Sequence, residues 1–446
     1  MIRRIGNLAT LAVVVFAATF AFGSYRQAQA TPSAAKPASA AQMPIAKPVE
    51  QLVTPTVVRT RPALPKIRAT VSGTVFGLAD ACQIGFCDQT SEALGTAFGY
   101  ARALGVGVIR TPLDWSKVAR ARPGSPCSPD DSSYNWTTAD DIARRATANN
   151  MQLIFDIDVM PAWLGADKQP PPAVELIDFA CTVAKRYSGF WRDPLLGDKY
   201  LPKIDHYEIL NEPNLPSHYD PTLVGMDYPT WAGLYGQLAD AAARTIHSQN
   251  SNAQVAAGAL ANNGAIQPLE FIRLMAFALK DVPGGPAFDA VSIHPYPLKD
   301  SADTPDYTMA NRTAALSGMV AFGNLGDLLS SLDEWWPNRH FDLWVTEVGW
   351  QTNQNGKQDG VSLDAQQAYL RRVAEIAAQP DSRIDYLCWF SLFSSPPDKD
   401  NNPSWQTGLM YMSGPLMRGT TVVKSPAYWA YKERIKKLTK FFGSKP

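Results

Sequence analysis

Short apolar runs alternate with longer segments of mixed polarity over most of the chain. Eight of these runs resemble buried strands, and they cover residues 71–78, 106–110, 153–158, 206–211, 254–258, 290–294, 343–347 and 384–390. Most of the intervals place apolar residues at helical spacing, namely 91–104, 138–149, 172–187, 228–249, 268–279 and 363–378. Strand and helix repeated in this order over about 250 residues or more predict an α/β fold, a closed parallel (β/α)8 TIM barrel that forms a single catalytic domain.

An open, doubly wound sheet is the main alternative for such a repeat. That architecture often carries a glycine-rich dinucleotide loop after a strand. The candidate stretch, LGVGVIRT at 104–111, contains two glycines and lacks the third. The closed barrel is therefore the better interpretation.

The N-terminal residues differ from the rest of the chain. Residues 1–30 combine Arg3 and Arg4, an apolar stretch from Leu8 to Phe22 and a small-residue end at 28–30, which predicts a signal peptide cleaved after residue 30. Residues 31–66 contain seven prolines and predict a Pro/Ala-rich linker before the barrel domain, 67–446. We therefore expect a secreted protein or one of the periplasm or cell envelope, in contact with a membrane only if the N-terminal segment stays uncleaved.

The charge balance narrows the class of partner. The chain has 41 basic and 41 acidic residues, for a net charge of +0 at pH 7. Non-specific nucleic-acid binding requires a basic surface, so no nucleic-acid partner is expected. A neutral substrate such as a sugar is compatible with this composition.

Five cysteines fit an exported protein. Cys82, Cys87 and Cys127 lie in loop-like sequence, and any two of them could form a disulfide. Cys181 lies in a helical pattern and Cys388 in a strand pattern. Both are expected to be buried thiols.

Polar and aromatic residues gather where the predicted strands end. The end positions hold Asp80, Arg110, Asp158, Asn211 with Glu212, His294, Glu347 and Trp389. Active sites of these barrels lie at the rim formed by the C-terminal strand ends. The sequence therefore predicts a functional site at this rim.

Glu212 and Glu347 end the fourth and the seventh predicted strands, which face each other across the mouth of an eight-stranded barrel. A pair of carboxyl groups facing each other across a cleft is what cleavage of a glycosidic bond requires. The alternative interpretation of each glutamate is a structural carboxylate paired with an arginine or a backbone amide. Glu208, four residues before Glu212, fits such an internal hydrogen-bonding role better than catalysis.

Four motifs resemble those of glycoside hydrolase clan A, the retaining (β/α)8 enzymes. EILNEPN at 208–214 and WVTEVGW at 344–350 are similar to its two glutamate motifs, and VIRTPLDW at 108–115 and SIHPYP at 292–297 extend the resemblance. Within the clan, the layout is most similar to family 39, the β-xylosidase and α-L-iduronidase family, and to its exopolysaccharide-cleaving relatives, with family 5 cellulase-like enzymes next. The typical β-xylosidase carries a β-rich domain after the barrel, which the sequence after residue 390 does not predict, so xylosidase specificity is not implied.

The resemblance implies that Glu212 is the acid/base and Glu347 the nucleophile. Retaining enzymes hold the two carboxyl groups about 5–5.5 Å apart. At that distance the charge of Glu347 would raise the pKa of Glu212 and keep it protonated, until esterification of Glu347 removes that charge. Arg110, if it reaches Glu347, would keep the nucleophile ionised.

The remaining candidates are substrate-binding residues. Asn211 can donate to a sugar hydroxyl, His294 lies in a rim motif, and Tyr296 could orient Glu347 through a hydrogen bond. Trp389 is expected to form an apolar floor under a sugar ring. Trp115, Trp163 and Trp350 also follow strand ends, and for each of them core packing is an equal alternative.

Together these features predict an exported, monomeric, retaining glycoside hydrolase without metal or cofactor. Its expected substrate is a β-linked polysaccharide or oligosaccharide, such as an extracellular microbial glycan, cleaved by double displacement through a covalent glycosyl-enzyme. A non-hydrolytic glycan-binding barrel and a transglycosylase are the alternatives. An inverting enzyme would instead place its carboxyl groups about 6.5–9.5 Å apart.

Overall fold

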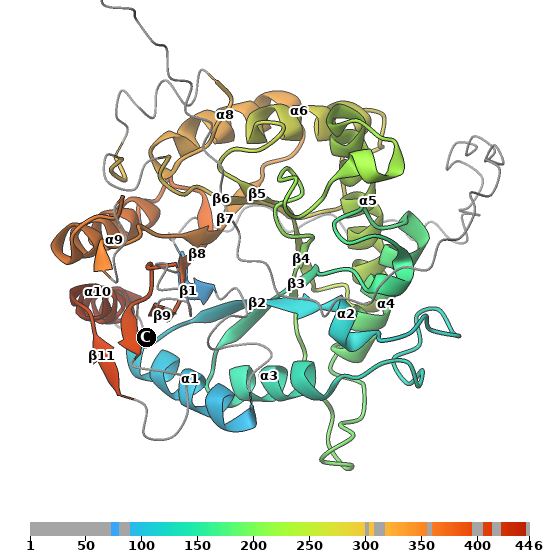
Figure 1. Cartoon of the computed structure of the whole chain (residues 1–446), viewed down its shortest axis with the longest axis horizontal. Helices are drawn as coiled ribbons and strands as arrows, with labels where there is room; N and C mark the ends of the chain where they lie inside the picture. The colour runs from blue at the N-terminus through green and yellow to red at the C-terminus, as the bar shows by residue number, and fades with distance from the viewer. Residues whose placement is uncertain are drawn as a thin grey trace, which may run out of the picture. The chain divides into compact units, whose positions relative to one another are not determined.

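A computed structural model of the chain describes residues 73–79, 90–298, 303–306, 317–354, 359–394, 405–412 and 421–442. Within these residues, eight parallel strands close into one barrel in chain order, with β8 hydrogen-bonded back to β1 (Figure 1). This confirms the predicted (β/α)8 barrel. The predicted signal peptide and linker, as well as Asp80, Cys82 and Cys87, lie outside the described residues.

The barrel strands match the predicted ones to within a few residues. They are β1 (Val75–Ala79), β2 (Val108–Asp114), β3 (Gln152–Asp158), β4 (His206–Ile209), β5 (Gln254–Ala261), β6 (Ala290–His294), β7 (Asp342–Val348) and β8 (Ile384–Phe390). A separate three-stranded sheet, which the sequence pattern did not predict, follows the barrel and consists of β9 (Phe393–Ser394), β10 (Met410–Met412) and β11 (Val422–Lys424).

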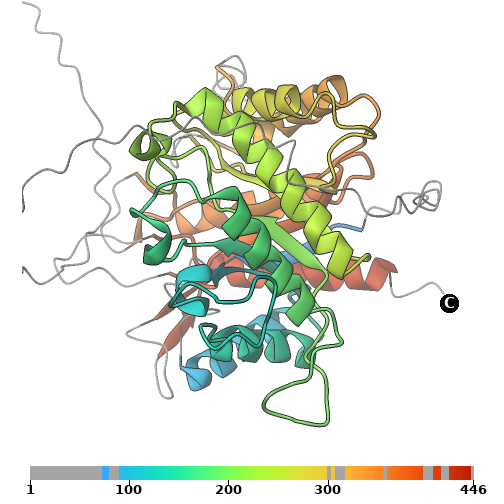
Figure 2. The same cartoon turned by 90° about the vertical axis from the view of Figure 1, so that its right-hand side faces the viewer.

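Helices surround the barrel. They are α1 (Ser91–Leu104), α2 (Trp115–Val118), α3 (Thr137–Ala148), α4 (Ala173–Arg186), α5 (Tyr228–Gln249), α6 (Pro268–Ala278), α8 (Leu325–Trp335), α9 (Leu363–Ala377) and α10 (Pro426–Phe442). In Figure 2 the long helix α5 runs diagonally across the outside of the strands. Helix α8 was not predicted. None of the described helices has the length and apolar character needed to span a bilayer.

Local capping sets where these helices begin and end. The Thr90 side chain accepts a hydrogen bond from the backbone N–H of Ala93 at the start of α1, and Ser362 does the same for Ala365 at α9. Helix α1 ends at Gly105, whose φ of 85° lies in the left-handed region that glycine adopts without strain. The chain then turns directly into β2.

The side chains of each barrel strand alternate between two cores. On β8, Tyr386, Cys388 and Phe390 point into the barrel interior, whereas Leu387 and Trp389 pack in the larger core between strands and helices. The thiol of Cys388 is free and buried, as predicted. The alternation matters for the site because it decides which of the last two aromatic residues of β8 faces the mouth.

A disulfide joins Cys127, in the loop before α3, to Cys181 of α4, with their Cα atoms 5.1 Å apart. The expectation that Cys181 is a buried thiol is therefore wrong. A helical pattern shows that a residue lies on a helix, but it does not show which loop of the chain packs against that helix.

Candidate active site

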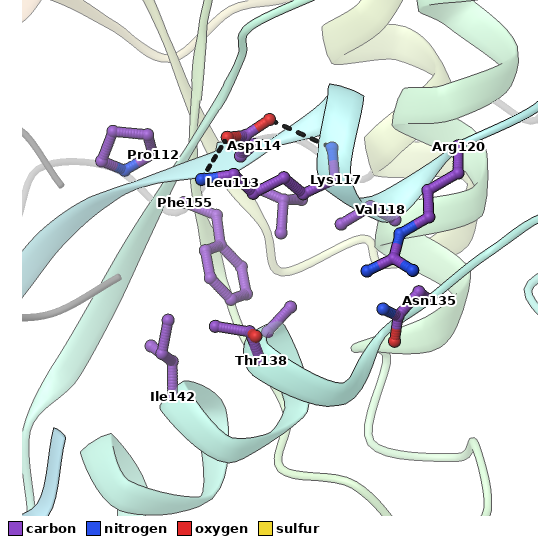
Figure 3. A pocket seen from close by; sticks show the side chains of 11 residues that line it. Pro112, Leu113, Asp114, Lys117, Val118, Arg120, Asn135, Thr138, Ile142 and Phe155 are labelled. Atoms are coloured by element: carbon purple, nitrogen blue, oxygen red, sulfur yellow. Dashed lines mark hydrogen bonds and ion pairs between the residues drawn. The ribbon is translucent and has the colours of Figure 1, made fainter. Parts of the chain in front are cut away.

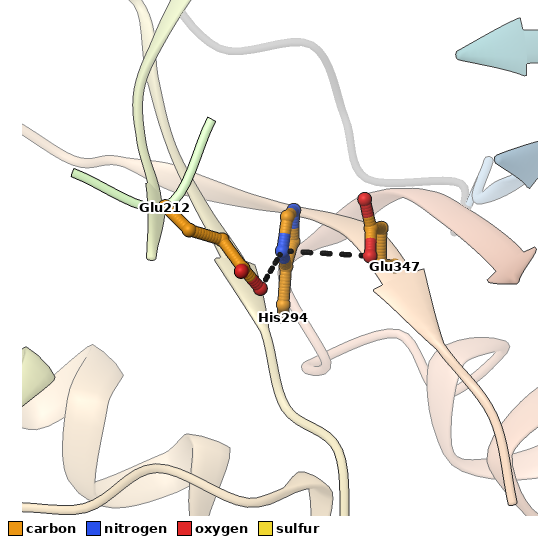
Figure 4. Close-up of side chains that lie close together, drawn as sticks. All are labelled: Glu212, His294 and Glu347. Carbon is orange, nitrogen blue, oxygen red and sulfur yellow. Dashed lines mark hydrogen bonds and ion pairs between the residues drawn. The ribbon is translucent and has the colours of Figure 1, made fainter. Parts of the chain in front are cut away.

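Three predicted site residues converge at the mouth of the barrel (Figure 4). His294 Nδ1 lies 2.9 Å from Glu212 Oε1 and 3.7 Å from Glu347 Oε2. One carboxyl oxygen of each glutamate and one ring nitrogen of His294 lie within 4.8 Å of one another. The carboxyl groups of the two glutamates, which are remote in sequence, thus lie close together at the mouth.

A strained turn aims Glu212 into this space. Strand β4 ends at Ile209, earlier than predicted, and Leu210 and Glu212 then adopt positive φ angles of 61° and 49°. Non-glycine residues in this region cost about 1–3 kcal/mol each unless the surroundings hold them there. Here the Leu210 N–H donates to the Ile157 carbonyl over 3.1 Å, and the Glu212 N–H donates to the Ala259 carbonyl over 3.0 Å.

The acceptor for Glu212 depends on an irregularity in β5. The pairing of β5 with β6 shifts register between Ala257 and Leu260. Gly258 has a φ of 122°, and a Cβ there would lie 2.4 Å from the carbonyl oxygen of Ser292, so only glycine fits. The Tyr235 hydroxyl from α5 accepts from the Gly258 N–H at 2.8 Å and donates to the Ile209 carbonyl at 2.7 Å. This phenol therefore ties the bulge to the end of β4.

Arg110, at the centre of the barrel, is 1% exposed and contacts four side-chain oxygens. Its Nε donates to Glu208 over 2.8 Å, its Nη1 to Glu347 over 2.6 Å, and its Nη2 to Asp156 over 2.9 Å and to Asn211 over 2.8 Å. Burial alone would lower the pKa of Arg110, but the three carboxyl groups raise it well above its ordinary value. Arg110 is therefore a fixed positive charge, and it makes the predicted contact with Glu347.

The pKa values of the two interior carboxyl groups shift in opposite directions. Burial tends to raise the pKa of Glu208, but Arg110, His294 and hydrogen bonds from hydroxyl groups leave it below its ordinary value. Burial raises the pKa of Asp156 well above its ordinary value despite Arg110. Glu208 thus provides the negative charge that balances Arg110 inside the barrel, which fits its expected internal role.

Burial raises the pKa of both Glu212 and Glu347 above the ordinary value. The positive charge of Arg110 opposes the shift at both groups. The sequence predicts that the charge of Glu347 raises the pKa of Glu212, whereas the main cause of the raised pKa is removal of the carboxyl group from water. Arg110 therefore moderates the pKa of Glu347 without bringing it below the ordinary value.

The motif at the end of β6 supplies two groups to the pair of glutamates. Tyr296 donates from its hydroxyl to Glu347 Oε2 over 2.8 Å, as expected from the sequence. Burial raises the pKa of Tyr296 well above its ordinary value, so the phenol keeps the hydrogen that it donates. Burial also lowers the pKa of His294, which favours its neutral ring.

Trp389 does not face the mouth. It is 2% exposed, lies in the core outside the strands, donates from Nε1 to the Thr407 carbonyl over 2.8 Å and stacks against Trp350. Assigning Trp389 to the substrate-binding set is therefore wrong, because the alternation along β8 directs it outward. Trp115 and Trp350 are core residues too, and Trp163 packs edge-on against Trp115.

Two aromatic residues that the sequence argument missed lie at the mouth instead. Phe390 takes the inward position at the end of β8, and the 39% exposed ring of Trp405 packs edge-on against both Tyr296 and Phe390, at 5.6 and 5.7 Å. Strict alternation over 384–390 could have identified Phe390. No local pattern brings Trp405 to the site, since it follows the barrel in sequence.

His218 was also missed. It lies in the loop after β4, and its Nε2 is 3.3 Å from Glu212 Oε2. Asp158, which was left out of the catalytic set, accepts from the Tyr219 hydroxyl and from the Asn211 N–H at 3.3 Å. Asp158 therefore supports the loop that carries Asn211.

The arrangement at the mouth favours carboxyl chemistry over metal binding. Glu212, His294 and Glu347 could in geometry offer three ligand atoms to a cation. Arg110 places a positive charge 2.6 Å from one oxygen of Glu347, and the Tyr296 hydroxyl occupies the other. A second cation at this position would be repelled by Arg110.

A pocket of about 80 Å³ lies elsewhere, between the end of β2 and helix α3 (Figure 3). Its lining residues are Pro112, Leu113, Asp114, Lys117, Val118, Arg120, Asn135, Thr138, Ala139, Ile142 and Phe155. None of the converging side chains at the mouth belongs to this lining.

Comparison with known proteins identifies similar barrels. No protein-family model and no curated protein matches the chain. A family 39 glycoside hydrolase from the gut symbiont Bacteroides cellulosilyticus WH2 has a similar structure, with a TM-score of 0.56 and 19% identity over 82% of this chain and 64% of that chain. A glucosidase from Croceicoccus marinus gives a TM-score of 0.56 and 16% identity over 82% of this chain and 67% of that chain.

A family 39 glycoside hydrolase from Xanthomonas axonopodis pv. citri gives a TM-score of 0.50 and 15% identity, over 82% of this chain and 67% of that chain. The chain thus spans about two thirds of the length of these three proteins. At such identities the similarity is one of fold. It agrees with the closed barrel described above.

Proposed function

We propose that this protein is a retaining O-glycoside hydrolase that cleaves a β-linked polysaccharide or oligosaccharide through a covalent glycosyl-enzyme. The observation that carries the proposal is that a carboxyl oxygen of Glu212 lies within 4.8 Å of one of Glu347 at the mouth of the barrel. Retaining enzymes hold these groups about 5–5.5 Å apart, whereas inverting enzymes leave about 6.5–9.5 Å for a water molecule. The short separation supports direct attack on the sugar.

In the first step, Glu347 attacks the anomeric carbon while Glu212 transfers its proton to the departing glycosidic oxygen. Arg110 and the Tyr296 hydroxyl each bind one oxygen of Glu347 and fix the carboxylate for attack. Burial raises the pKa of Glu212, which favours the protonated form that an acid needs. The C–O bond to the leaving group breaks as the bond to Glu347 forms.

In the second step, a water molecule attacks the same carbon and Glu212 accepts a proton from it. The bond between the sugar and Glu347 breaks, and the carboxylate returns to its contacts with Arg110 and Tyr296. While Glu347 is esterified it carries no charge, so an ionised Glu212 meets no repulsion from it and the group can act as a base. Each residue thus ends the cycle in the state in which it began.

Three further observations support a glycan as the substrate. The similar barrels described above include proteins named as family 39 glycoside hydrolases and a glucosidase. The four motifs at 108–115, 208–214, 292–297 and 344–350 resemble those of clan A. The export signal predicted at 1–30 favours a glycan outside the cytoplasm, such as an extracellular microbial polysaccharide.

A glycan panel tests the proposal. Purified protein is incubated with β-linked polysaccharides and oligosaccharides, and the products are identified by mass spectrometry, with the anomeric configuration followed by NMR. We expect release of a shorter glycan with retained configuration, and loss of release in Glu212→Gln and Glu347→Gln. Glu334→Gln, at an exposed position on α8, is the matched control for loss of a carboxylate.

Three outcomes would contradict the proposal. Binding without any product would favour a glycan-binding barrel. Products lengthened in the presence of an acceptor sugar would favour a transglycosylase. Inverted configuration would exclude the covalent intermediate.

A further inference from the structure

Different imidazoles flank the two oxygens of Glu212. His294 Nδ1 lies 2.9 Å from Oε1, and His218 Nε2 lies 3.3 Å from Oε2. His294 is buried at the mouth, whereas the side chain of His218 is 32% exposed and lies on the loop after β4. The mechanism above gives His218 no role.

A chain of hydrogen bonds fixes the polarity of the His218 ring. Arg110 has only donors, so the Asn211 oxygen accepts from its Nη2 over 2.8 Å. The Asn211 amide nitrogen is therefore the atom that lies 3.4 Å from His218 Nδ1, and it can only donate. Nδ1 must then accept, which places the hydrogen of the neutral ring on Nε2, facing Glu212.

We propose that His218 is a positioning residue for the acid/base: Asn211 holds it as the Nε2–H tautomer, and it donates to Glu212 Oε2. This inference rests on the proposed glycosidase function. An N–H donor bonds more strongly to a carboxylate oxygen than to the oxygen of a protonated carboxyl group, so this contact favours the ionised form of Glu212.

The same contact acts on the carboxylate that remains after proton transfer. Once Glu212 is ionised, the N–H of His218 donates to a full negative charge and the bond becomes stronger. His218 therefore makes Glu212 a better acid in the transition state than in the resting enzyme. Its loss should slow cleavage only where the leaving group needs a proton.

The tautomer can be measured without any substrate. The chain has five histidines, so a protein labelled with ¹⁵N-histidine gives a simple long-range ¹H–¹⁵N spectrum. His218→Gln assigns the signal of His218 by its disappearance. We expect the Nε2–H pattern in the wild-type protein and a loss of this preference in Asn211→Ala. An Nδ1–H pattern for His218 would overturn the proposal.

The catalytic effect is measured with aryl glycosides of the sugar that the panel identifies. His218→Phe removes the donor but keeps a ring, and His218→Gln restores an N–H at a similar distance. We expect His218→Phe to lower kcat/KM by about tenfold for a poor leaving group, the effect of one hydrogen bond to a charged group, and to change it less than about twofold for a dinitrophenyl leaving group. His218→Gln should recover most of the loss, and His340→Gln, at a 70% exposed position, is the control.

Equal losses with good and poor leaving groups would show a merely structural role and overturn the proposal. Absence of recovery in His218→Gln would overturn it as well. A protein that shows the Nε2–H tautomer but cleaves no glycoside would overturn the proposed function while leaving the hydrogen-bonded chain supported.

Discussion

Arg110 Nη1 donates to Glu347 Oε1 over 2.6 Å, although the two residues are 237 positions apart in sequence. The same guanidinium also binds Glu208 and Asp156, so the proposed nucleophile shares its cation with two interior carboxyl groups. The charge that holds Glu347 in place is therefore also part of what holds the barrel interior together. Changes at this position should affect folding and function together.

Arg110→Met tests this connection. The substitution leaves Glu208 buried without its cation, so we expect the free energy of unfolding to fall by about 3–5 kcal/mol in addition to a loss of turnover. Denaturant unfolding measures the change. A second change, Glu208→Gln, should restore part of the stability. Arg273→Met, which breaks an exposed ion pair with Glu270 on α6, is the control and should cost less than about 1 kcal/mol.

Glu347→Gln tests the nucleophile. The amide cannot form the covalent intermediate, so we expect turnover to fall by at least about a thousandfold while glycan affinity stays within a few-fold of the wild type. In the wild-type protein, a 2-fluoro glycoside of the cleaved sugar should label Glu347, as detected by peptide mass spectrometry. Labelling of another residue would remove Glu347 from this role.

The same substitution should stabilise the protein in a manner that depends on pH. Burial raises the pKa of Glu347 in the folded state, so the folded protein holds this proton more tightly than the unfolded chain does. The resulting contribution to stability is complete below the ordinary carboxyl pKa of about 4.3 and is lost as the pH rises through the raised value. Glutamine carries no charge at any pH, so the Tm of Glu347→Gln minus that of the wild type should increase as the pH rises.

Calorimetric scans at about pH 4 and about pH 7.5 measure this gain. Glu334→Gln reports the effect of the same change on the surface of α8. A Tm difference for Glu347→Gln that shrinks with rising pH would contradict the raised pKa.

Tyr296→Phe removes the hydroxyl that donates to Glu347 Oε2. That hydrogen bond lowers the pKa of Glu347, so its loss should raise this pKa further. The acidic limb of the pH profile of kcat/KM should therefore move to higher pH, with a fall in maximal rate of about tenfold. An acidic limb that moves to lower pH would mean that Tyr296 does not stabilise the charged form of Glu347.

Trp405 and Trp389 should give opposite results on substitution. Trp405 is 39% exposed at the mouth, so Trp405→Ala should raise KM with little change in the free energy of unfolding. Trp389 is 2% exposed in the outer core, so Trp389→Ala should destabilise the protein by about 3–5 kcal/mol. Steady-state kinetics and denaturant unfolding distinguish the two effects. An unchanged KM in Trp405→Ala would place the substrate elsewhere.

The barrel itself was predictable because its cause is local. Apolar runs such as 153–158 and 384–390 alternate with segments of helical spacing, and a closed parallel sheet surrounded by helices buries all of these strands at once. The rim position of Glu212, His294 and Glu347 followed from strand ends, whereas Arg110 was wrongly expected to end its strand: β2 runs from Val108 to Asp114, and Arg110 lies inside the barrel. The wrong predictions arose where the alternation of side chains along a strand or the position of a loop decided the outcome. Trp389 takes an outward position on β8, and Cys181 forms a disulfide with a cysteine of a loop.

The sequence by itself determined the strand-helix repeat and the residue types gathered at one rim, because both depend on periodicity and on which residues end each strand. Only the tertiary structure decided how these residues share protons and charge. The bulge at Gly258, the positive φ of Glu212 and the approach of His218 and Trp405 to the mouth depend on contacts between segments distant in the chain. Burial, the main cause of the raised pKa values of both glutamates, is a property of the closed barrel and of no single segment.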